Sequence, residues 1–209
     1  MSETVGQAVE QATAPKMISP DTFAQVLPVH LGPEKFTRWA LTLLRRPDLA
    51  AAAQTDAGRL SIMSALLDCA SLGLEPGRTY HLVPYKDVVT GIVDYKGEIQ
   101  LITNAQRCTV VAQLVRKADT FAMRGANTPP LHDADWFADR GDVTGGYAYT
   151  DFGGGLYSLV VLMSEADFAH HRARAQTKNV WDEWPEPMRL KTLVHQLRKW
   201  VPWSAEVRT

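Results

Sequence analysis

The stretch Thr79–Lys96, TYHLVPYKDVVTGIVDYK, decides the fold prediction, because the residue pattern changes here from helical to extended. Its two halves, Thr79–Tyr85 and Val88–Tyr95, are rich in β-branched and aromatic residues, which are enriched in strands. Only the dipeptide Lys86-Asp87 separates the two halves. The sequence therefore predicts a β-hairpin, and the other elements are assigned outward from it.

Helices are predicted on both sides of this hairpin. Before it, apolar residues recur at helical spacing over Glu34–Arg46 and over Arg59–Leu72, and Gly73 is a typical helix end. After it, Lys96–Ala105 again places apolar residues at helical spacing. The hairpin is thus expected between helical segments.

The rest of the chain combines strands and helices in a less regular order. The expected elements are a strand over Cys108–Phe121, a loop over 125–142, strands at about 143–151 and 155–163, a helix from a Ser164–Asp167 capping box to Gln176, a loop over Trp181–Pro187 and a helix over Met188–Trp200. This order predicts an α+β fold, in which helices pack on a small, mostly antiparallel sheet with a β-hairpin.

The composition is that of a chain that builds its own core. Of 209 residues, 45% are hydrophobic and 22% charged, as in soluble globular domains. The two cysteines, Cys69 and Cys108, are too few for a disulfide framework or a thiolate zinc site. No apolar run has the length of a membrane span, and the N-terminus lacks the signal-peptide pattern. We therefore expect a cytoplasmic protein with no membrane partner.

Charge is unevenly distributed along the chain, although the formal net charge is −1. Segments 78–124 and 170–209 carry net charges of +3 and +4, whereas segment 125–168 carries −6. Such asymmetry can form a basic groove on a neutral protein, or it can balance charge across a surface.

Two kinds of chemistry fit the residues of the hairpin region. The carboxylates of Asp87 and Asp94 could hold Mg²⁺, and the amine of Lys96 could lie beside the phosphate that is attacked, as a nuclease requires. Alternatively, basic residues interleaved with aromatic ones could bind single-stranded nucleic acid through its phosphates and stacked bases. The residues alone leave both alternatives open, together with an oligomeric scaffold that has no role in DNA chemistry.

Several separated blocks of sequence resemble one family. Leu66–Gly77 resembles a "CAxLGLEPG" helix end, Tyr80–Lys86 an "AYLVPYK" strand, and Tyr95–Gly97 a "GYKG" turn into a helix. Leu27–Leu41 is similar to "LPxHLxPEKFxRxAL", and Trp181 with the segment 188–202 is similar to "W…MARKTVIRRLxKYLP". In this order, over about residues 26–204, the blocks resemble the RecT family of phage single-strand annealing proteins.

The resemblance implies ATP-independent binding of single-stranded DNA and annealing of complementary strands in phage-type homologous recombination. It implies a non-enzymatic protein that acts as an oligomeric ring or filament in the cytoplasm of a bacterial host. It further implies that no cofactor is required, with Mg²⁺ in at most a supportive role. The expected partners are single-stranded DNA, the annealed duplex intermediate, further copies of the chain, and a phage exonuclease or a host single-strand binding protein.

By motif position, the resemblance places eight residues in or near a DNA-binding groove: Tyr85, Lys86, Tyr95, Lys96, Arg116, Lys191, Arg198 and Lys199. Tyr80 and Trp200 are weaker candidates, because such residues more often lie in a core. Two departures lower the expected charge of the groove. Asp94 stands where the family usually has glycine, and His195-Gln196 where two arginines are common.

The expected domain organisation follows from composition and from the resemblance. Residues 1–19 are small and polar and are expected to form a mobile arm, 20–204 a RecT-like annealing core, and 205–209 a short C-terminal stub. The partner-binding C-terminal region of the family is expected to be absent. The acidic segment 125–168 should face away from DNA or contact a basic face of a neighbouring subunit.

Overall fold

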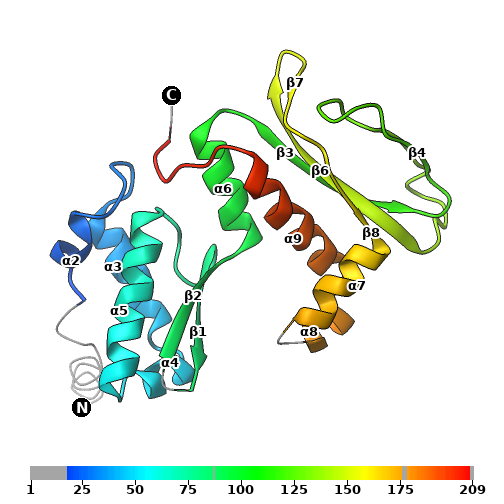
Figure 1. Ribbon diagram of the computed structural model, residues 1–209. Helices are drawn as coiled ribbons and strands as arrows, with labels where there is room; N and C mark the ends of the chain where they lie inside the picture. Colours follow the sequence, from blue (N-terminus) through cyan, green and yellow to red (C-terminus); the bar gives the residue numbers. More distant parts are fainter. Residues whose placement is uncertain (1–17, 87, 176–177, 208–209) are drawn as a thin grey trace. The chain divides into compact units, whose positions relative to one another are not determined.

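The chain folds into two compact units, and the computed structural model in Figure 1 confirms the predicted α+β class. The structure describes residues 18–86, 88–175 and 178–207. The boundary between the units falls between Gly97 and Glu98, inside a helix that contributes residues to both. Each unit is described here by itself.

The first unit consists of helices and the predicted β-hairpin. Its elements are α2 (Pro20–Ala24), α3 (Pro33–Leu43), α4 (Pro47–Ala52), α5 (Asp56–Ser71), β1 (Tyr80–Tyr85), β2 (Val88–Val93) and the start of α6 (Tyr95–Ala105). The predicted helices over Glu34–Arg46 and Arg59–Leu72 are confirmed as α3 and α5, with ends shifted by a few residues. Of the predicted arm, residues 1–19, only the last two lie within the described residues.

Helix α5 ends at a glycine in the left-handed conformation. Gly73 has a φ of 64°, and its N–H donates to the carbonyl of Ala70 at 2.9 Å. The N–H of Leu74 donates to the carbonyl of Cys69 at 3.2 Å, which completes a Schellman motif. These bonds satisfy the last carbonyls of the helix and direct the chain toward β1, so the Leu66–Gly77 motif is a structural entry to the hairpin.

Side-chain alternation along the hairpin decides which of its residues face solvent. Tyr80 and Leu82 of β1 are buried, whereas Tyr85 has the opposite parity and is 46% exposed. Burial raises the pKa of Tyr80 to about 12. The N–H of Val89 donates to Ser61 Oγ of α5 at 2.9 Å, which fixes β2 on that helix. Tyr80 is therefore a core residue, as its residue type suggested.

The second unit is built on an antiparallel sheet. Its elements are the rest of α6, β3 (Thr109–Arg116), β4 (Thr120–Ala122), β5 (Leu131–Asp133), β6 (Val143–Gly153), β7 (Leu156–Tyr157), β8 (Val161–Ser164), α7 (Glu165–Arg174), α8 (Lys178–Glu183), α9 (Pro185–Leu197) and the 3-10 helix η1 (Arg198–Trp200). Strand β6 is central, with β3 on one side and β7 and β8 on the other.

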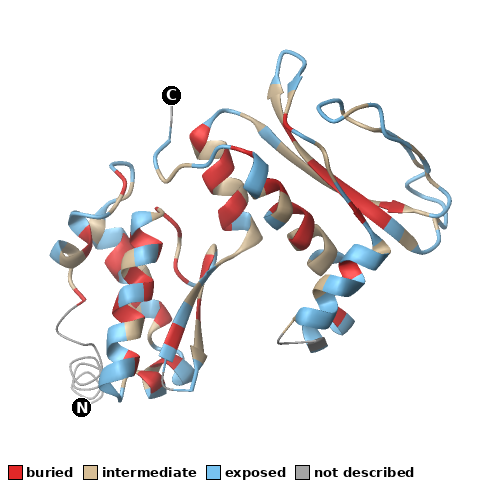
Figure 2. Ribbon diagram, viewed as in Figure 1, coloured by how far each residue is buried: buried red, intermediate tan, exposed pale blue. Residues whose placement is uncertain are grey.

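One face of this sheet is covered by α9 and α7. Ala148 of β6 and Met163 of β8 are buried in one cluster with Phe168 of α7 and with Leu193 and Leu197 of α9. Figure 2 shows this buried layer between the helix and the sheet. The prediction that the last helix buries its apolar side is therefore confirmed, and its polar side is left for other contacts.

The opposite face of the sheet carries the segment 117–142, which we call the flap. It contains β4 and β5, which pair with each other rather than with the main sheet. Tyr147, which precedes Ala148 in β6, contacts Phe121 and His132 of the flap, with ring centroids 5.7 and 5.5 Å apart. Because successive side chains of a strand point to opposite faces, the flap and α9 lie on opposite sides of the sheet (Figure 1).

The flap begins where the predicted strand Cys108–Phe121 ends early. Its first part, β3, stops at Arg116, whose backbone N–H donates to Asp119 Oδ2 at 2.7 Å. This bond forms a turn, so the second part of the predicted strand becomes β4. The predicted loop over 125–142 contains the short strand β5, and the predicted strand over 155–163 is divided into β7 and β8.

The short helices α2 and α4 were not among the expected elements, and the predicted loop Trp181–Pro187 is a further difference. Helix α8 extends through Glu183, and α9 already begins at Pro185. Proline has no N–H to leave unpaired in the first helical turn, so Pro185 begins this helix as readily as Pro187 would. Trp181 is buried in the core cluster, which holds α8 in place.

Candidate nucleic-acid interface

The hairpin of the first unit presents Tyr85 and Lys86 together at its turn. Tyr85 pairs with Val88 in the register, and Lys86 follows directly and is exposed. Lys86 has a φ of 56°, which is unfavourable for a side chain other than glycine, asparagine or aspartate. A two-residue hairpin turn requires a positive φ at its first position, so this conformation, which costs lysine about 1–2 kcal/mol, follows from the turn between Tyr85 and Val88.

The start of α6 brings Tyr95 and Lys96 together. Lys96 is exposed, and its Nζ lies 6.0 Å from the centroid of the Tyr95 ring. Gly97 follows, where a Cβ would lie only 2.4 Å from the carbonyl oxygen of Thr79. The glycine of this motif is therefore required by the close approach of the helix to the chain before β1.

Asp94, the acid that departs from the family pattern, directly precedes α6. Its backbone N–H donates to the carbonyl of Thr79 at 2.9 Å, and aspartate is a favoured residue type just before a helix. The second acid of the nuclease alternative, Asp87, lies outside the described residues. Within the described residues, no three His, Cys, Asp or Glu side chains come together as possible ligands for a metal ion.

Arg116 lies at the end of β3 in the second unit and is already engaged. Its guanidinium donates to the carbonyl of Gly141 at 3.0 Å and forms an ion pair with Glu186 in the first turn of α9. The side chain is 25% exposed. A phosphate could bind Arg116 only beside, or in competition with, this carboxylate.

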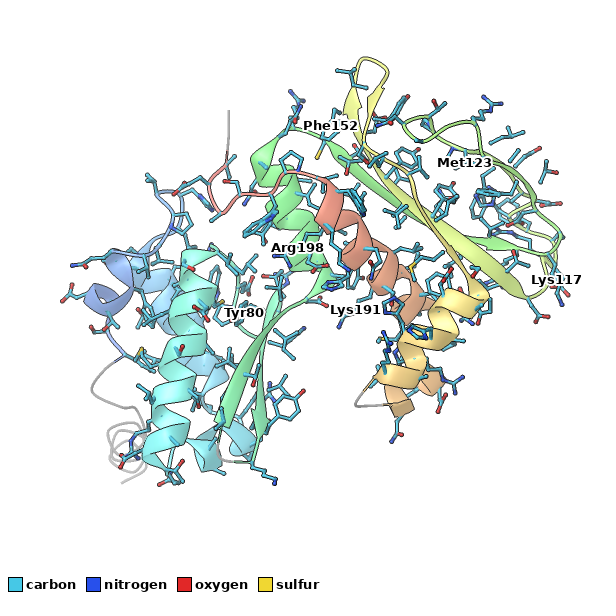
Figure 3. The ribbon with its side chains drawn as sticks, viewed as in Figure 1. Tyr80, Lys117, Met123, Phe152, Lys191 and Arg198 are labelled. Atoms are coloured by element: carbon cyan, nitrogen blue, oxygen red, sulfur yellow. The ribbon has the colours of Figure 1, made fainter. Side chains whose placement is uncertain are left out.

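The last helix carries a polar stripe that includes two predicted site residues. Lys191, His195 and Arg198 follow one another at spacings of four and three residues, so they share one side of α9 and its 3-10 extension. Figure 3 shows the side chains of Lys191 and Arg198 on this helix. The stripe is separate from the buried side formed by Leu193 and Leu197.

A buried acid holds part of this stripe. Glu98 of α6 is 3% exposed, and its Oε1 lies 2.8 Å from His195 Nδ1 and 3.4 Å from Arg198 Nη1. Burying a carboxylate is costly unless it is paired and hydrogen-bonded, so these contacts fix α6 against the end of α9. They also offset some of the positive charge that Arg198 brings.

Beyond α9, cations and exposed aromatic rings are adjacent. The Arg198 guanidinium lies 4.9 Å from the ring centroid of Trp203, which is 47% exposed. Lys199 is exposed, and its Nζ donates to Gln196 Oε1 at 2.8 Å. Trp200 is 63% exposed, so the core position suggested by its residue type is wrong.

The electrostatic environment beside η1 is basic. Partial burial lowers the pKa of the His171 imidazole of α7, and the nearby basic side chains of His170, Lys199, His195 and Arg174 lower it further. Of these side chains, Lys199 and Arg174 are cations at neutral pH. The C-terminal end of α9 is thus a positive region within a unit that also contains the acidic flap.

The predicted site residues fall into two sets, one in each unit. Tyr85, Lys86, Tyr95 and Lys96 belong to the first unit, and Arg116, Lys191, Arg198 and Lys199 to the second. Sequence reasoning missed Glu98 and Trp203. Glu98 had a detectable signal, because an acid three residues before Leu101 on the apolar side of a helix must find a partner.

Comparison with known proteins identifies the chain's relatives. The model of the RecT family matches residues 34–209. Protein RecT of Escherichia coli (strain K12) is 28% identical over 202 residues, which covers 90% of this chain and 73% of that protein. No helix in the described part of the chain is both long and apolar enough to cross a membrane. The family match covers well over half of the sequence and includes all eight predicted site residues, so the chain belongs to the RecT family.

Proposed function

We propose that this chain binds single-stranded DNA and anneals complementary strands without ATP, in phage-type homologous recombination, as an oligomeric ring or filament. Membership of the RecT family supports a role as a recombination and annealing protein. Binding of single-stranded DNA is supported by one observation in particular, that each unit places a cation beside an accessible aromatic ring. These pairs are Lys96 with Tyr95 and Arg198 with Trp203.

This pairing suits a protein that must hold one strand without reading its sequence. Lysine and arginine neutralise phosphates and release counterions, whatever the bases are. Aromatic rings stack on bases, and each stacked base contributes about 1–3 kcal/mol with little sequence preference. A strand held in this way keeps its hydrogen-bonding edges available for a complementary strand.

The direct test mixes two complementary labelled oligonucleotides with the full chain, without ATP. We expect pairing to be faster than without protein, while both strands keep their full length. The assay is repeated with EDTA and with Mg²⁺, because Mg²⁺-dependent shortening would instead support a nuclease. Unchanged pairing with no protein bound to either strand would support a scaffold without a DNA role.

The predicted residues are tested by Lys96→Ala and Lys191→Ala. Each lost phosphate contact should weaken binding of single strands about fivefold, or about 1 kcal/mol. The loss should be similar for all sequences, and the log–log slope of affinity against salt should decrease by about 0.7.

Lys117→Ala is the matched control for these variants. Lys117 is exposed, and its Nζ forms an ion pair with Asp142 at 2.7 Å in the acidic flap. Its replacement should leave affinity for DNA and the salt slope unchanged. If Lys96→Ala and Lys191→Ala behave like Lys117→Ala, the proposed binding surface is wrong.

A further inference from the structure

The flap ends in an exposed aromatic pair within an acidic loop. Phe137 is fully exposed and Trp136 is 60% exposed, and the acids Asp133, Asp135 and Asp139 on either side are exposed as well. A solvent-exposed pair of large rings in an ordered loop is unusual for a monomeric surface and indicates a contact with another molecule. We call residues 133–139 the tip.

The tip is ordered by the structure behind it. Asp135 Oδ1 accepts the backbone N–H of Phe137 at 3.1 Å. The Arg140 guanidinium lies 4.4 Å from the ring centroid of Trp136 and donates to both carboxylate oxygens of Asp119, at 2.7 and 2.6 Å. The side chain of Asp119 has no exposed surface, so the tip is anchored through Arg140 to a buried carboxylate. The backbone of Phe137 is therefore held in place while its ring projects into solvent, so binding need not order the backbone of the tip.

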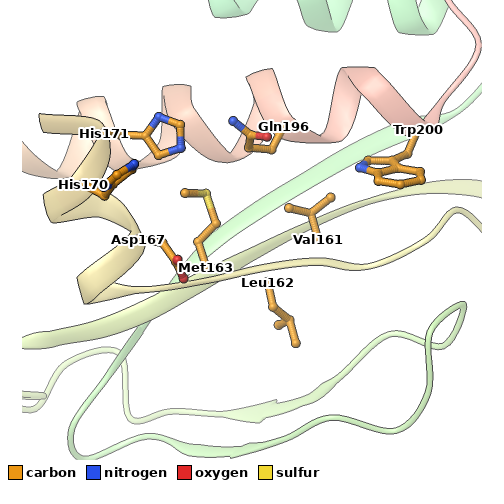
Figure 4. A pocket seen from close by; sticks show the side chains of 8 residues that line it. All are labelled: Val161, Leu162, Met163, Asp167, His170, His171, Gln196 and Trp200. Atoms are coloured by element: carbon orange, nitrogen blue, oxygen red, sulfur yellow. The ribbon is translucent and has the colours of Figure 1, made fainter. Parts of the chain in front are cut away.

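A groove of about 270 Å³ lies on the other face of the same sheet. Val161 and Met163 of β8 form its floor, while His170 and His171 of α7, Gln196 of α9 and Trp200 of η1 form its sides. Figure 4 shows Val161 and Met163 pointing toward the helix that carries Gln196. A cavity of about 150 Å³ is enough to hold benzene, so this groove has room for one aromatic ring.

The charges of the tip and of the surroundings of the groove are complementary. The tip presents three exposed acids. Among the residues that line the groove, Asp167 is acidic, but its Oδ2 is already bonded to Ser164 in the capping box of α7. The last turn of α7, which continues from the lining residue His171, is basic, and its Arg174 is exposed, as is Lys199 of η1. Complementary charge favours this pairing over contacts between two tips or two grooves, which like charges oppose.

The tip cannot reach the groove of its own chain. It belongs to the flap, which covers the Tyr147 side of the sheet, whereas the groove opens beside α7 and α9 on the Ala148 side. A contact between tip and groove must therefore join two copies. Such a contact uses different surfaces on the two partners, so it repeats from copy to copy and forms a ring or a filament.

We propose that the Trp136–Phe137 tip of one subunit inserts into the groove between β8, α7 and α9 of a second copy of this chain. This inference rests on the proposed function only in that an annealing assembly needs a repeating contact. It assigns that contact to two named surfaces. Of the residues that form them, only Trp200 was also a candidate for the DNA-binding groove, and a weaker one.

The first test measures the size of the full chain by sedimentation as a function of concentration. Phe137→Ala removes the ring that inserts into the groove, so it should raise at least tenfold the concentration below which the assemblies dissociate. The subunit should still fold, because this ring makes no contact within its own subunit that folding needs. Leu60→Ala, which removes an exposed apolar side chain on α5, is the matched control and should change it less than twofold. The proposal would be overturned if Phe137→Ala assembled at the same concentrations as wild type, or if wild type were a monomer.

The second test places cysteines on both surfaces. Phe137→Cys and Gln196→Cys proteins, mixed and oxidised, should form a disulfide-linked dimer, and the double variant should form a ladder of linked subunits. Phe137→Cys mixed with Thr90→Cys, an exposed position on β2, is the control and should remain unlinked. Equal cross-linking in both mixtures, or in neither, would contradict the contact.

Binding of short single strands separates this proposal from the proposed function. A strand that only one subunit can hold should bind Phe137→Ala as well as wild type, within twofold. If wild type assembles through the tip but binds no single strand, the contact stands and the proposed function fails. If short strands bind but Phe137→Ala assembles normally, the proposed function stands and the contact fails.

Discussion

At the scale of single residues, the charged side chains of the second unit are of two kinds, those in buried ion pairs and those that are exposed to solvent. Asp119 is the centre of the buried group. Its side chain is fully buried, Arg140 binds both of its oxygens, and His132 Nε2 lies 3.0 Å from Oδ2. Lys199, by contrast, is exposed, and its Nζ donates to the neutral side-chain amide of Gln196. Burial therefore distinguishes the charges that support the fold from those that are available to a ligand, and sequence alone does not.

Asp119 gives the fold a predictable dependence on acid. The Arg140 guanidinium, with the Arg116 N–H and His132, holds the pKa of Asp119 well below its usual range, although burial opposes this shift. A carboxyl whose pKa is lowered in the folded state stabilises the protein above its unfolded pKa of about 3.9. Its contribution is lost as the pH falls from there through the folded pKa.

We expect Asp119→Asn to lower the free energy of unfolding by about 2–4 kcal/mol at pH 7, because it leaves the Arg140 charge without its partner. Below about pH 4 the difference from wild type should shrink, since wild type then begins to lose the same interaction. Urea unfolding between pH 7 and pH 2 measures both effects. Asp133→Asn, at an exposed position on β5, should change stability by less than about 0.5 kcal/mol. A gap that stays constant with pH would refute this account.

The residues of the candidate site were predictable to different degrees. Alternation along β1 separates the buried Tyr80 from the exposed Tyr85, and this alternation is visible in the sequence. The exposure of Trp200 was not predictable, because it depends on where α9 changes to a 3-10 turn. The contact of Trp203 with Arg198 likewise depends on that turn. Local periodicity thus specifies the faces of an element but not what happens at its end.

At the scale of elements, strong local signals predicted the structure and weak ones did not. The hairpin, α5 and α9 have clear periodicity or end signals and were correctly predicted. The flap has neither, since β4 and β5 are short strands that pair only with each other. Their position is fixed by the contact of Phe121 with Tyr147 and by the bonds of Asp119 to His132 and Arg140, which join residues distant in sequence. Tertiary contacts of this kind leave no periodic pattern in the chain.

The capping box of α7 is the clearest case of a local signal with a measurable effect. Ser164 Oγ accepts the Asp167 N–H at 3.2 Å, and Asp167 Oδ2 accepts the Ser164 N–H at 2.8 Å. Ser164→Ala removes the first bond and should lower the free energy of unfolding by about 1 kcal/mol. Ser164→Thr keeps an accepting hydroxyl and should restore most of this loss.

Ser71→Ala is the control for the capping prediction. Ser71 Oγ donates to the carbonyl of Asp68 near the exposed end of α5, so it caps no helix start. Its replacement should change the free energy of unfolding by less than about 0.5 kcal/mol, measured by urea denaturation. Equal losses for Ser164→Ala and Ser71→Ala would mean that the capping box contributes nothing specific.

At the scale of the whole molecule, a net charge of −1 requires that binding of a polyanion be local and repeated. The chain as a whole is not basic, and the flap adds the exposed acids Asp133, Asp135 and Asp139 on the other face of the second unit. Copies joined from tip to groove would hold many local binding sites along one strand. Each further site then binds at a high effective concentration, and affinity rises without any new kind of contact.

The dependence of affinity on strand length tests this argument for the intact protein. With wild type, a strand that spans several subunits should bind about 10²-fold more tightly than a strand that spans one, because linked sites act together. With Phe137→Ala, affinity should increase only in proportion to the number of sites, while Leu60→Ala should behave as wild type. Fluorescence anisotropy with oligonucleotides of increasing length, at constant salt, measures all three proteins. A steep length dependence that survives in Phe137→Ala would mean that the subunits cooperate on DNA through a surface other than the tip.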